Sequence, residues 1–153
     1  MKHTLLKLSY QFRNAINYIK DTGLYEYNSF FSRFPSGCCG DTSDLLAQYF
    51  YDHGIVAKYV CGTWHGETSY DSQSHAWLLV GNLVVDITGD QFRYSENFLC
   101  FDKQVYVGTI NEFYKLFEVE LCDVREYNSS SILTGEQKSI YKKIIAHINK
   151  GFV

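Results

Sequence analysis

Residues 34–62 read FPSGCCGDTSDLLAQYFYDHGIVAKYVCG and predict a helix that begins beside two adjacent cysteines. Pro35 and Gly37 break the chain just before this helix, and Gly54 stands where a left-handed C-terminal cap is expected. The apolar residues between these signals recur at i, i+1, i+4 and i+5, the spacing of one helix face: Leu45, Leu46, Tyr49 and Phe50. We therefore expect a helix from about residue 39 to residue 53.

Cys39 falls in the first turn of this helix. Unpaired backbone N–H groups and the positive end of the helix dipole favour an anion there, so the position suits a thiolate nucleophile. Asp41 lies in the same turn and opposes a thiolate through like-charge repulsion. Activation would then need His75 as its main cation. Without its partners, Cys39 reads as a small buried hydrophobic residue.

Residues 74–88 read SHAWLLVGNLVVDIT and predict two strands joined by the two-residue turn Gly81-Asn82. With this turn Val80 pairs with Leu83, and His75 and Asp86 become diagonal neighbours on one face of the hairpin. A carboxylate can reach an imidazole from that position. A slip of one residue in the register would send Asp86 to the opposite face, so the arrangement depends on the turn length.

Together these residues form a candidate catalytic triad. Cys39 would attack an acyl carbon, His75 would move the proton, and Asp86 would orient the ring and stabilise the imidazolium. The backbone N–H of Cys39 would supply one donor of an oxyanion hole. The second donor is left open, and three residues are candidates for it or for contacts with substrate: Ser36, Gln73 and Trp77. Trp77 is also expected to shield the triad from water.

Five short motifs between residues 34 and 91 resemble the core of the transglutaminase-like superfamily of papain-type cysteine enzymes. They are Cys39-Gly40-Asp41, Leu45-Leu46, the run GIVAK at 54–58, His75-Ala76-Trp77 and Asp86-Ile87-Thr88. The resemblance implies that Cys39, and not Cys38, is the nucleophile, because Asp41 and the Leu pair fall at the family's offsets only from Cys39. It also implies an α+β, papain-like fold in which the nucleophile helix packs against an antiparallel sheet. The chain departs from the family pattern at Val56, where Pro is usual, and at Cys38.

The function expected from these residues is a cysteine-dependent hydrolase of the peptidase or amidase type, which acts on a peptide or protein through a thioester. One alternative is acyl transfer, as in a protein transglutaminase or deamidase. The other is a protein-binding module that keeps the fold and has lost the reaction. The presence of Cys39, His75 and Asp86 together favours an enzyme over the module.

Length and composition fit one domain over residues 1–153. A net charge of −3 without a basic run argues against nucleic acid as a partner, and no apolar segment is long enough to cross a membrane. Five cysteines without a secretory signal predict reduced thiols and a cytoplasmic location. We expect no cofactor and no metal, because a zinc site built from the Cys38-Cys39 pair with Cys61 and His65 lacks a strong ligand spacing. The oligomeric state stays open.

The rest of the chain predicts further elements. An amphipathic helix precedes a turn at residues 21–23, and a capping box at Thr134 and Gln137 opens a C-terminal helix. A strand is expected between residues 103 and 109, whereas residues 111–127 fit helix and strand equally. Residues 62–73 are expected to form a mobile rim of the active site. The aromatic-rich stretch before the nucleophile fits either a binding loop or ordinary core: Tyr25, Tyr27, Phe30, Phe31 and Phe34.

Overall fold

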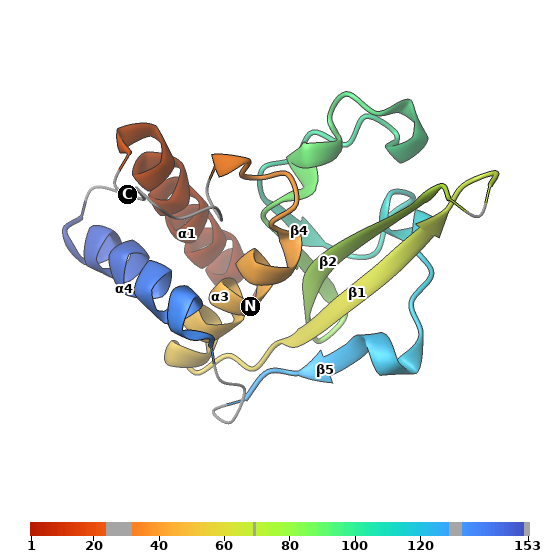
Figure 1. The fold of residues 1–153 in the computed structure, drawn as a ribbon. Coiled ribbons are helices and arrows are strands. Elements are labelled where there is room, and N and C mark those ends of the chain that lie inside the picture. Colours follow the sequence, from red (N-terminus) through yellow and green to blue (C-terminus); the bar gives the residue numbers. More distant parts are fainter. Residues whose placement is uncertain (24–31, 69, 129–132, 152–153) are drawn as a thin grey trace.

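The computed structural model describes residues 1–23, 32–68, 70–128 and 133–151, and it has an α+β architecture (Figure 1). Three α-helices lie in the described ranges: α1 (Lys2–Thr22), α3 (Cys39–Asp52) and α4 (Gly135–Asn149). Five strands form one sheet: β1 (Lys58–His65), β2 (Ser72–Val80), β3 (Leu83–Asp86), β4 (Tyr106–Gly108) and β5 (Val124–Glu126). Their order is β4-β3-β2-β1-β5, and each neighbouring pair is antiparallel.

Helix α3 confirms the helix predicted from the apolar spacing. It begins at Cys39 and ends one residue earlier than expected, at Asp52, and Gly54 has the positive φ of +75° that its place after the helix predicts. The predicted apolar face is buried: Leu45, Leu46, Tyr49 and Phe50. Burial of this face fixes the rotation of the helix and, with it, the place of Cys39.

The β2–β3 hairpin has the predicted register. Val80 pairs with Leu83, and Leu78 pairs with Val85 across a turn at Gly81 and Asn82. Gly81 has a φ of +60° and Asn82 is not among the residues with positive φ, as in a type II′ turn. Because the register holds, His75 and Asp86 lie on the same face of the sheet.

The prediction of a loop over residues 62–73 is wrong at both ends, because the strands on either side extend into it. Strand β1 continues to His65 and β2 begins at Ser72, so the two strands form a long hairpin and only residues 66–71 connect them. Backbone pairing between Thr63 and Ser74 and between Trp64 and Gln73 explains the difference, because hydrogen bonds along the ladder extend strands through polar residues.

The remaining elements agree with the sequence in part. Helices α1 and α4 are present, and the predicted capping box forms, since Gln137 N donates to Thr134 Oγ1 (3.1 Å) and Thr134 N donates to Gln137 Oε1 (2.9 Å). The strand expected between residues 103 and 109 is the short β4. The ambiguous stretch 111–127 contains two 3₁₀ turns, Tyr114–Leu116 and Leu121–Asp123, followed by β5.

The two faces of the sheet carry different covers. Helices α1, α3 and α4 lie together on one side in Figure 1 and bury one apolar cluster, to which β2 and β3 contribute Leu78 and Val85. The other face is covered by the short helices and loops that follow β3, with an aromatic cluster: Trp77, Phe92, Phe98, Phe113, Tyr114 and Phe117. Asp86 and His75 contact this aromatic layer.

Four members of the aromatic-rich stretch, Tyr25, Tyr27, Phe30 and Phe31, lie outside the described residues. Phe34, the fifth, is only 2% exposed and belongs to the helical core. None of the helices in the described ranges has the length and apolar character needed to span a membrane.

Candidate active site

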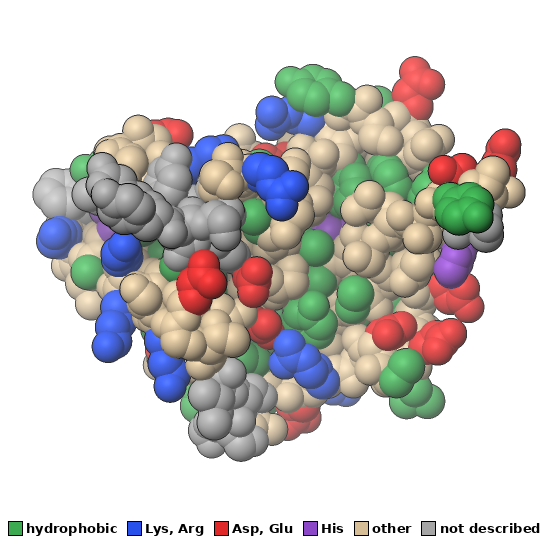
Figure 2. All heavy atoms as spheres, viewed as in Figure 1, with side chains coloured by type: hydrophobic (Ala, Val, Ile, Leu, Met, Phe, Trp, Pro, Cys, Tyr) green, Lys and Arg blue, Asp and Glu red, His purple; other side chains and the backbone are tan. Residues whose placement is uncertain are grey.

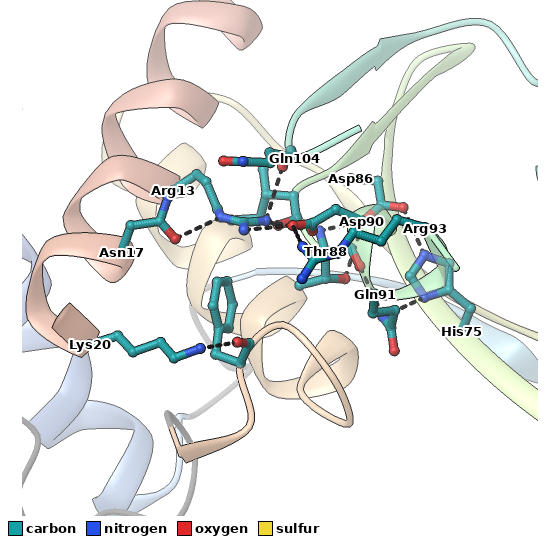
Figure 3. Close-up of polar contacts among 12 residues, drawn as sticks. Arg13, Asn17, Lys20, His75, Asp86, Thr88, Asp90, Gln91, Arg93 and Gln104 are labelled. Atoms are coloured by element: carbon teal, nitrogen blue, oxygen red, sulfur yellow. Dashed lines mark hydrogen bonds and ion pairs between the residues drawn. The ribbon is translucent and has the colours of Figure 1, made fainter. Parts of the chain in front are cut away.

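His75 and Asp86 form a buried hydrogen-bonded pair. Nε2 of His75 lies 2.7 Å from Oδ2 of Asp86, and both side chains are almost fully enclosed (Figure 3). The hairpin places them there, because its two-residue turn sets the diagonal pairing of the two strands. Asp86 therefore fixes one ring nitrogen and leaves Nδ1 for other contacts.

Asp86 accepts hydrogen bonds from three residues. Besides the ring, the Tyr114 hydroxyl donates to Oδ2 (2.9 Å), and Thr88 donates to Oδ1 through its backbone N–H (2.9 Å) and its hydroxyl (3.3 Å). Burial alone would raise the pKa of Asp86, but the charge and hydrogen bond of His75, with the bonds from Thr88 and Tyr114, lower it. The carboxylate is thus held in its charged form.

The His75 ring has no exposed surface and is packed among aromatic side chains. Phe92 lies edge-on to the ring, with 5.0 Å between the centroids. The rings of Phe117 and Trp77 are tilted against it, with centroids at 5.6 Å and 5.7 Å. Such a wall excludes water and strengthens the electrostatic interactions of the ring.

Cys39 interacts with His75 from the start of α3. Burial acts to lower the pKa of His75, but the charge and hydrogen bond of Asp86 and those of Cys39 outweigh it and raise the pKa to about 9. Because Nε2 is bonded to Asp86, the ring nitrogen left for Cys39 is Nδ1. The three residues of the predicted triad are therefore neighbours in the order Cys39, His75, Asp86.

Cys38 has a different environment although it is the next residue. Its side chain is 5% exposed, and its thiol donates to the carbonyl oxygen of Ser36 at 3.2 Å. Burial first, and then the charges of Asp41 and Cys39, raise the pKa of Cys38 to about 11. Cys39 is more exposed and lies beside an imidazole. Of the two thiols, only Cys39 has the setting of a nucleophile.

Asp41 is tied to another element. Its Oδ1 accepts a hydrogen bond from Gln137 Nε2 of α4 at 2.9 Å. This contact holds the carboxylate toward α4 and links the C-terminal helix to the first turn of α3.

Tyr59 of β1 lies against the first turn of α3, next to Gly40. A Cβ built on Gly40 would lie 3.2 Å from the Tyr59 hydroxyl, so glycine leaves the space that the phenol occupies. The guanidinium of Arg125 lies over the ring at 4.2 Å from its centroid. Burial, with the charges of Cys61, Asp44 and Cys39, raises the pKa of Tyr59 to about 12, so the hydroxyl keeps its proton. In the described part of the chain it has no hydrogen-bond partner.

The three other sequence candidates lie in different settings. Ser36 is exposed in the turn before α3, and Gln73 is exposed on β2 with its amide donating to the Ser74 carbonyl (3.1 Å). Trp77 is 2% exposed, and its indole N–H has no hydrogen-bond partner in the described ranges. Trp77 therefore lies in the aromatic wall beside His75.

Sequence reasoning missed Gln91 and Tyr114, which contact the two ends of the pair. Gln91 Nε2 lies 3.4 Å from His75 Nδ1, and Tyr114 reaches Asp86 from 28 residues further along the chain. Gln91 follows the Asp-x-Thr motif by three residues, and this spacing was the one available signal. Tyr114 lies in the stretch that fitted helix and strand equally, so nothing marked it.

Within the described ranges, no group of three or more His, Cys, Asp and Glu side chains is arranged to hold a metal ion. Comparisons of the chain with protein-family models, with curated proteins and with solved structures gave no match.

Proposed function

We propose that this protein is a cysteine-dependent hydrolase that cleaves a peptide or amide bond through the triad Cys39, His75 and Asp86. The observation that carries the proposal is the buried imidazole, held at Nε2 by a charged carboxylate and adjacent to a thiol at a helix N-terminus. We also propose that the fold is a papain-like fold of the transglutaminase-like type, on the order of its helix and strands and the motifs that they carry.

The reaction follows from the contacts. The Cys39 thiol gives its proton to Nδ1 of His75 as sulfur bonds to the acyl carbon, and the carbonyl π electrons move to oxygen. The carbon–nitrogen bond then breaks, and Nδ1–H gives its proton to the leaving amine. Water next attacks the thioester, its proton passes to Nδ1, and the carbon–sulfur bond breaks to regenerate the thiol. Asp86 keeps the second ring nitrogen oriented throughout.

The oxyanion formed in these steps needs donors. The backbone N–H of Cys39 at the helix start is one, and we propose the hydroxyl of Tyr59 as the second in place of Ser36 or Gln73. It is protonated at neutral pH, lies against Gly40 and has no partner among the described residues. One such donor is worth about 3 kcal/mol of transition-state stabilisation.

The first test is the rate of iodoacetamide labelling as a function of pH, with the labelled cysteine identified by mass spectrometry. Cys38→Ser and Cys39→Ser serve as a matched pair, because the two thiols are adjacent and fall in one peptide. We expect Cys38→Ser to keep a fast-reacting thiol near pH 6 and Cys39→Ser to lose it. His75→Ala should slow the remaining reaction about 100-fold or more. Equal rates at all five cysteines would contradict the triad and favour the binding module.

Hydrolysis and acyl transfer are separated by a second experiment. A peptide amide substrate is offered with and without a labelled primary amine, and products are analysed for free acid and for incorporated amine. The proposal predicts the free acid in both cases. Incorporation of the amine as the main product would replace hydrolysis by the transglutaminase reaction while leaving the triad in place.

A further inference from the structure

The side chain of Gln91 occupies the side of His75 that faces away from Asp86. Gln91 belongs to the 3₁₀ turn Gly89–Phe92, and its Nε2 donates to the Thr88 carbonyl oxygen at 3.0 Å and lies 3.4 Å from His75 Nδ1 (Figure 3). The Thr88 carbonyl can only accept, so it fixes which end of the amide faces the ring. The end that faces Nδ1 is the NH₂ group.

This orientation has a chemical consequence for the ring. An amide N–H can only donate, and Nδ1 accepts only when it carries no proton. Asp86 stabilises the charged ring from the Nε2 side, whereas Gln91 stabilises the neutral ring from the Nδ1 side. The titratable groups that face the ring are Asp86, with Tyr114 bonded behind it, and Cys39. Besides these and Gln91, aromatic side chains surround the ring.

A buried ion pair keeps the Gln91 turn in place. Arg13 of α1 donates to both carboxylate oxygens of Asp90 at 2.8 Å and to the carbonyl oxygen of Ile87 at 2.7 Å. Arg13 and Asp90 are 4% and 2% exposed, so the contact is sealed from solvent. Because Asp90 precedes Gln91 directly, α1 anchors the backbone from which the amide reaches His75.

We propose that Gln91 is a positioning residue that favours the unprotonated state of Nδ1 of His75, the state that can accept the proton of Cys39. The inference rests on the proposed function. When the thiol proton moves to Nδ1, that nitrogen can no longer accept from Gln91. The amide N–H then becomes free to donate to the anion that has formed on sulfur or on the substrate oxygen. Gln91 thereby offsets part of the preference of Asp86 for the charged ring, so that the ring can also release its proton to the leaving amine.

The test is a pH titration of the full chain labelled with ¹⁵N-histidine, carried out in a Cys39→Ala background so that the ring titrates without the thiol. The ¹⁵N shifts show which ring nitrogen carries the proton and at which pH the ring becomes neutral. Gln91→Met keeps the side-chain length and removes the donor, and we expect it to raise the midpoint of His75 by about half a pH unit.

Gln91→Glu adds a negative charge at the same place and should raise the midpoint further. Gln73→Glu is the matched control, because it makes the same change on an exposed residue of β2 whose amide, within the described ranges, donates only to the Ser74 carbonyl. We expect Gln73→Glu to shift the midpoint less than Gln91→Glu.

The proposal is overturned if Gln91→Met leaves the midpoint unchanged, or if Gln91→Glu shifts it no more than the Gln73→Glu control does. This readout needs no substrate and no active thiol. A failure of the proposed hydrolase would instead appear in the labelling experiment with Cys39 present. The two failures are therefore distinguishable.

Discussion

At the scale of single residues, the site depends on how fully Asp86 is satisfied. Its carboxylate accepts from His75, from Tyr114 and twice from Thr88. Hydrogen bonds to a charged group are stronger than neutral ones, and together these bonds fix the orientation of the carboxylate that holds the ring. Rotation of the His75 ring would break the Asp86 bond without an alternative partner in the aromatic wall.

Tyr114→Phe tests how much one of the hydrogen bonds to Asp86 contributes to stability. The change removes the donor to Asp86 and leaves no new buried polar atom, so we expect it to lower the free energy of unfolding by about 2 kcal/mol. Urea unfolding at pH 7 measures it. Tyr94→Phe, at a side chain that is 86% exposed, should change stability by less than about 0.5 kcal/mol. Equal effects of the two changes would show that the Tyr114 bond contributes nothing.

The sequence predicted that Cys39, His75 and Asp86 lie together because each of them lies in a segment with its own local signal. A helix start, a strand and a two-residue turn are readable without tertiary structure, and the turn fixes the register. Gln91 and Tyr114 carry no such signal. Their roles depend on a 3₁₀ turn held by Arg13 and on a contact between distant segments, which periodicity does not encode.

At the scale of elements, helix α1 does more than cover the core. Arg13 reaches from α1 to Asp90, Ile87 and Gln104, and its guanidinium lies over the Phe34 ring at 4.7 Å. Lys20, two turns further along the same helix, donates to the Phe34 carbonyl oxygen. One face of α1 thus joins the segment before Cys39 to the segment after β3.

Breaking this junction should be costly. Arg13→Met leaves the buried Asp90 carboxylate without its main cation, and we expect a loss of about 3–5 kcal/mol in the free energy of unfolding. The double change Arg13→Met with Asp90→Leu removes both charges and should recover most of that loss. Chemical denaturation of both variants checks this. If the double variant is as unstable as the single one, the uncompensated charge is not the cause.

The elements that the sequence predicted well are those with long periodic patterns: α1, α3, α4 and the β2–β3 hairpin. Strands β4 and β5 are three residues each and have too few positions to show a period. Strand β5 is placed by pairing with β1, and the Tyr127 N–H donates to the Ala57 carbonyl (2.9 Å), a contact far along the chain. These short edge strands are determined by their pairing with neighbouring strands, and the local sequence does not reveal them.

At the scale of the whole molecule, the sheet separates a helical core from an aromatic layer, and the charged pair lies in the layer. Figure 2 shows that on the viewed face most of the basic side chains lie over the helices on the left, whereas acidic side chains predominate toward the right. The His75–Asp86 pair is enclosed, so its protonation bears on folding as a whole.

The sign of this effect follows from the two shifts. The pKa of His75 rises from 6.5 to about 9 on folding, so its stabilisation is complete below pH 6.5 and is lost as the pH rises through 9. The pKa of Asp86 falls from 3.8, so its stabilisation is present above that value and is lost in acid. We expect the free energy of unfolding to decrease between pH 6.5 and 9, and Asp86→Asn to flatten this decrease. Urea midpoints of the wild type and of Asp86→Asn, measured between pH 6.5 and 9, test both expectations. If the two proteins lose stability in parallel, the pH dependence does not come from the His75–Asp86 pair.

The complete enclosure of the His75 ring also limits how fast its protons meet the solvent. With no exposed ring surface, a proton on either nitrogen can exchange with bulk water only when the aromatic wall or the start of α3 opens. The ring N–H protons should therefore exchange slowly enough to give resolved, strongly downfield NMR signals. The rate at which these signals disappear in D₂O would then report how often the closed site opens.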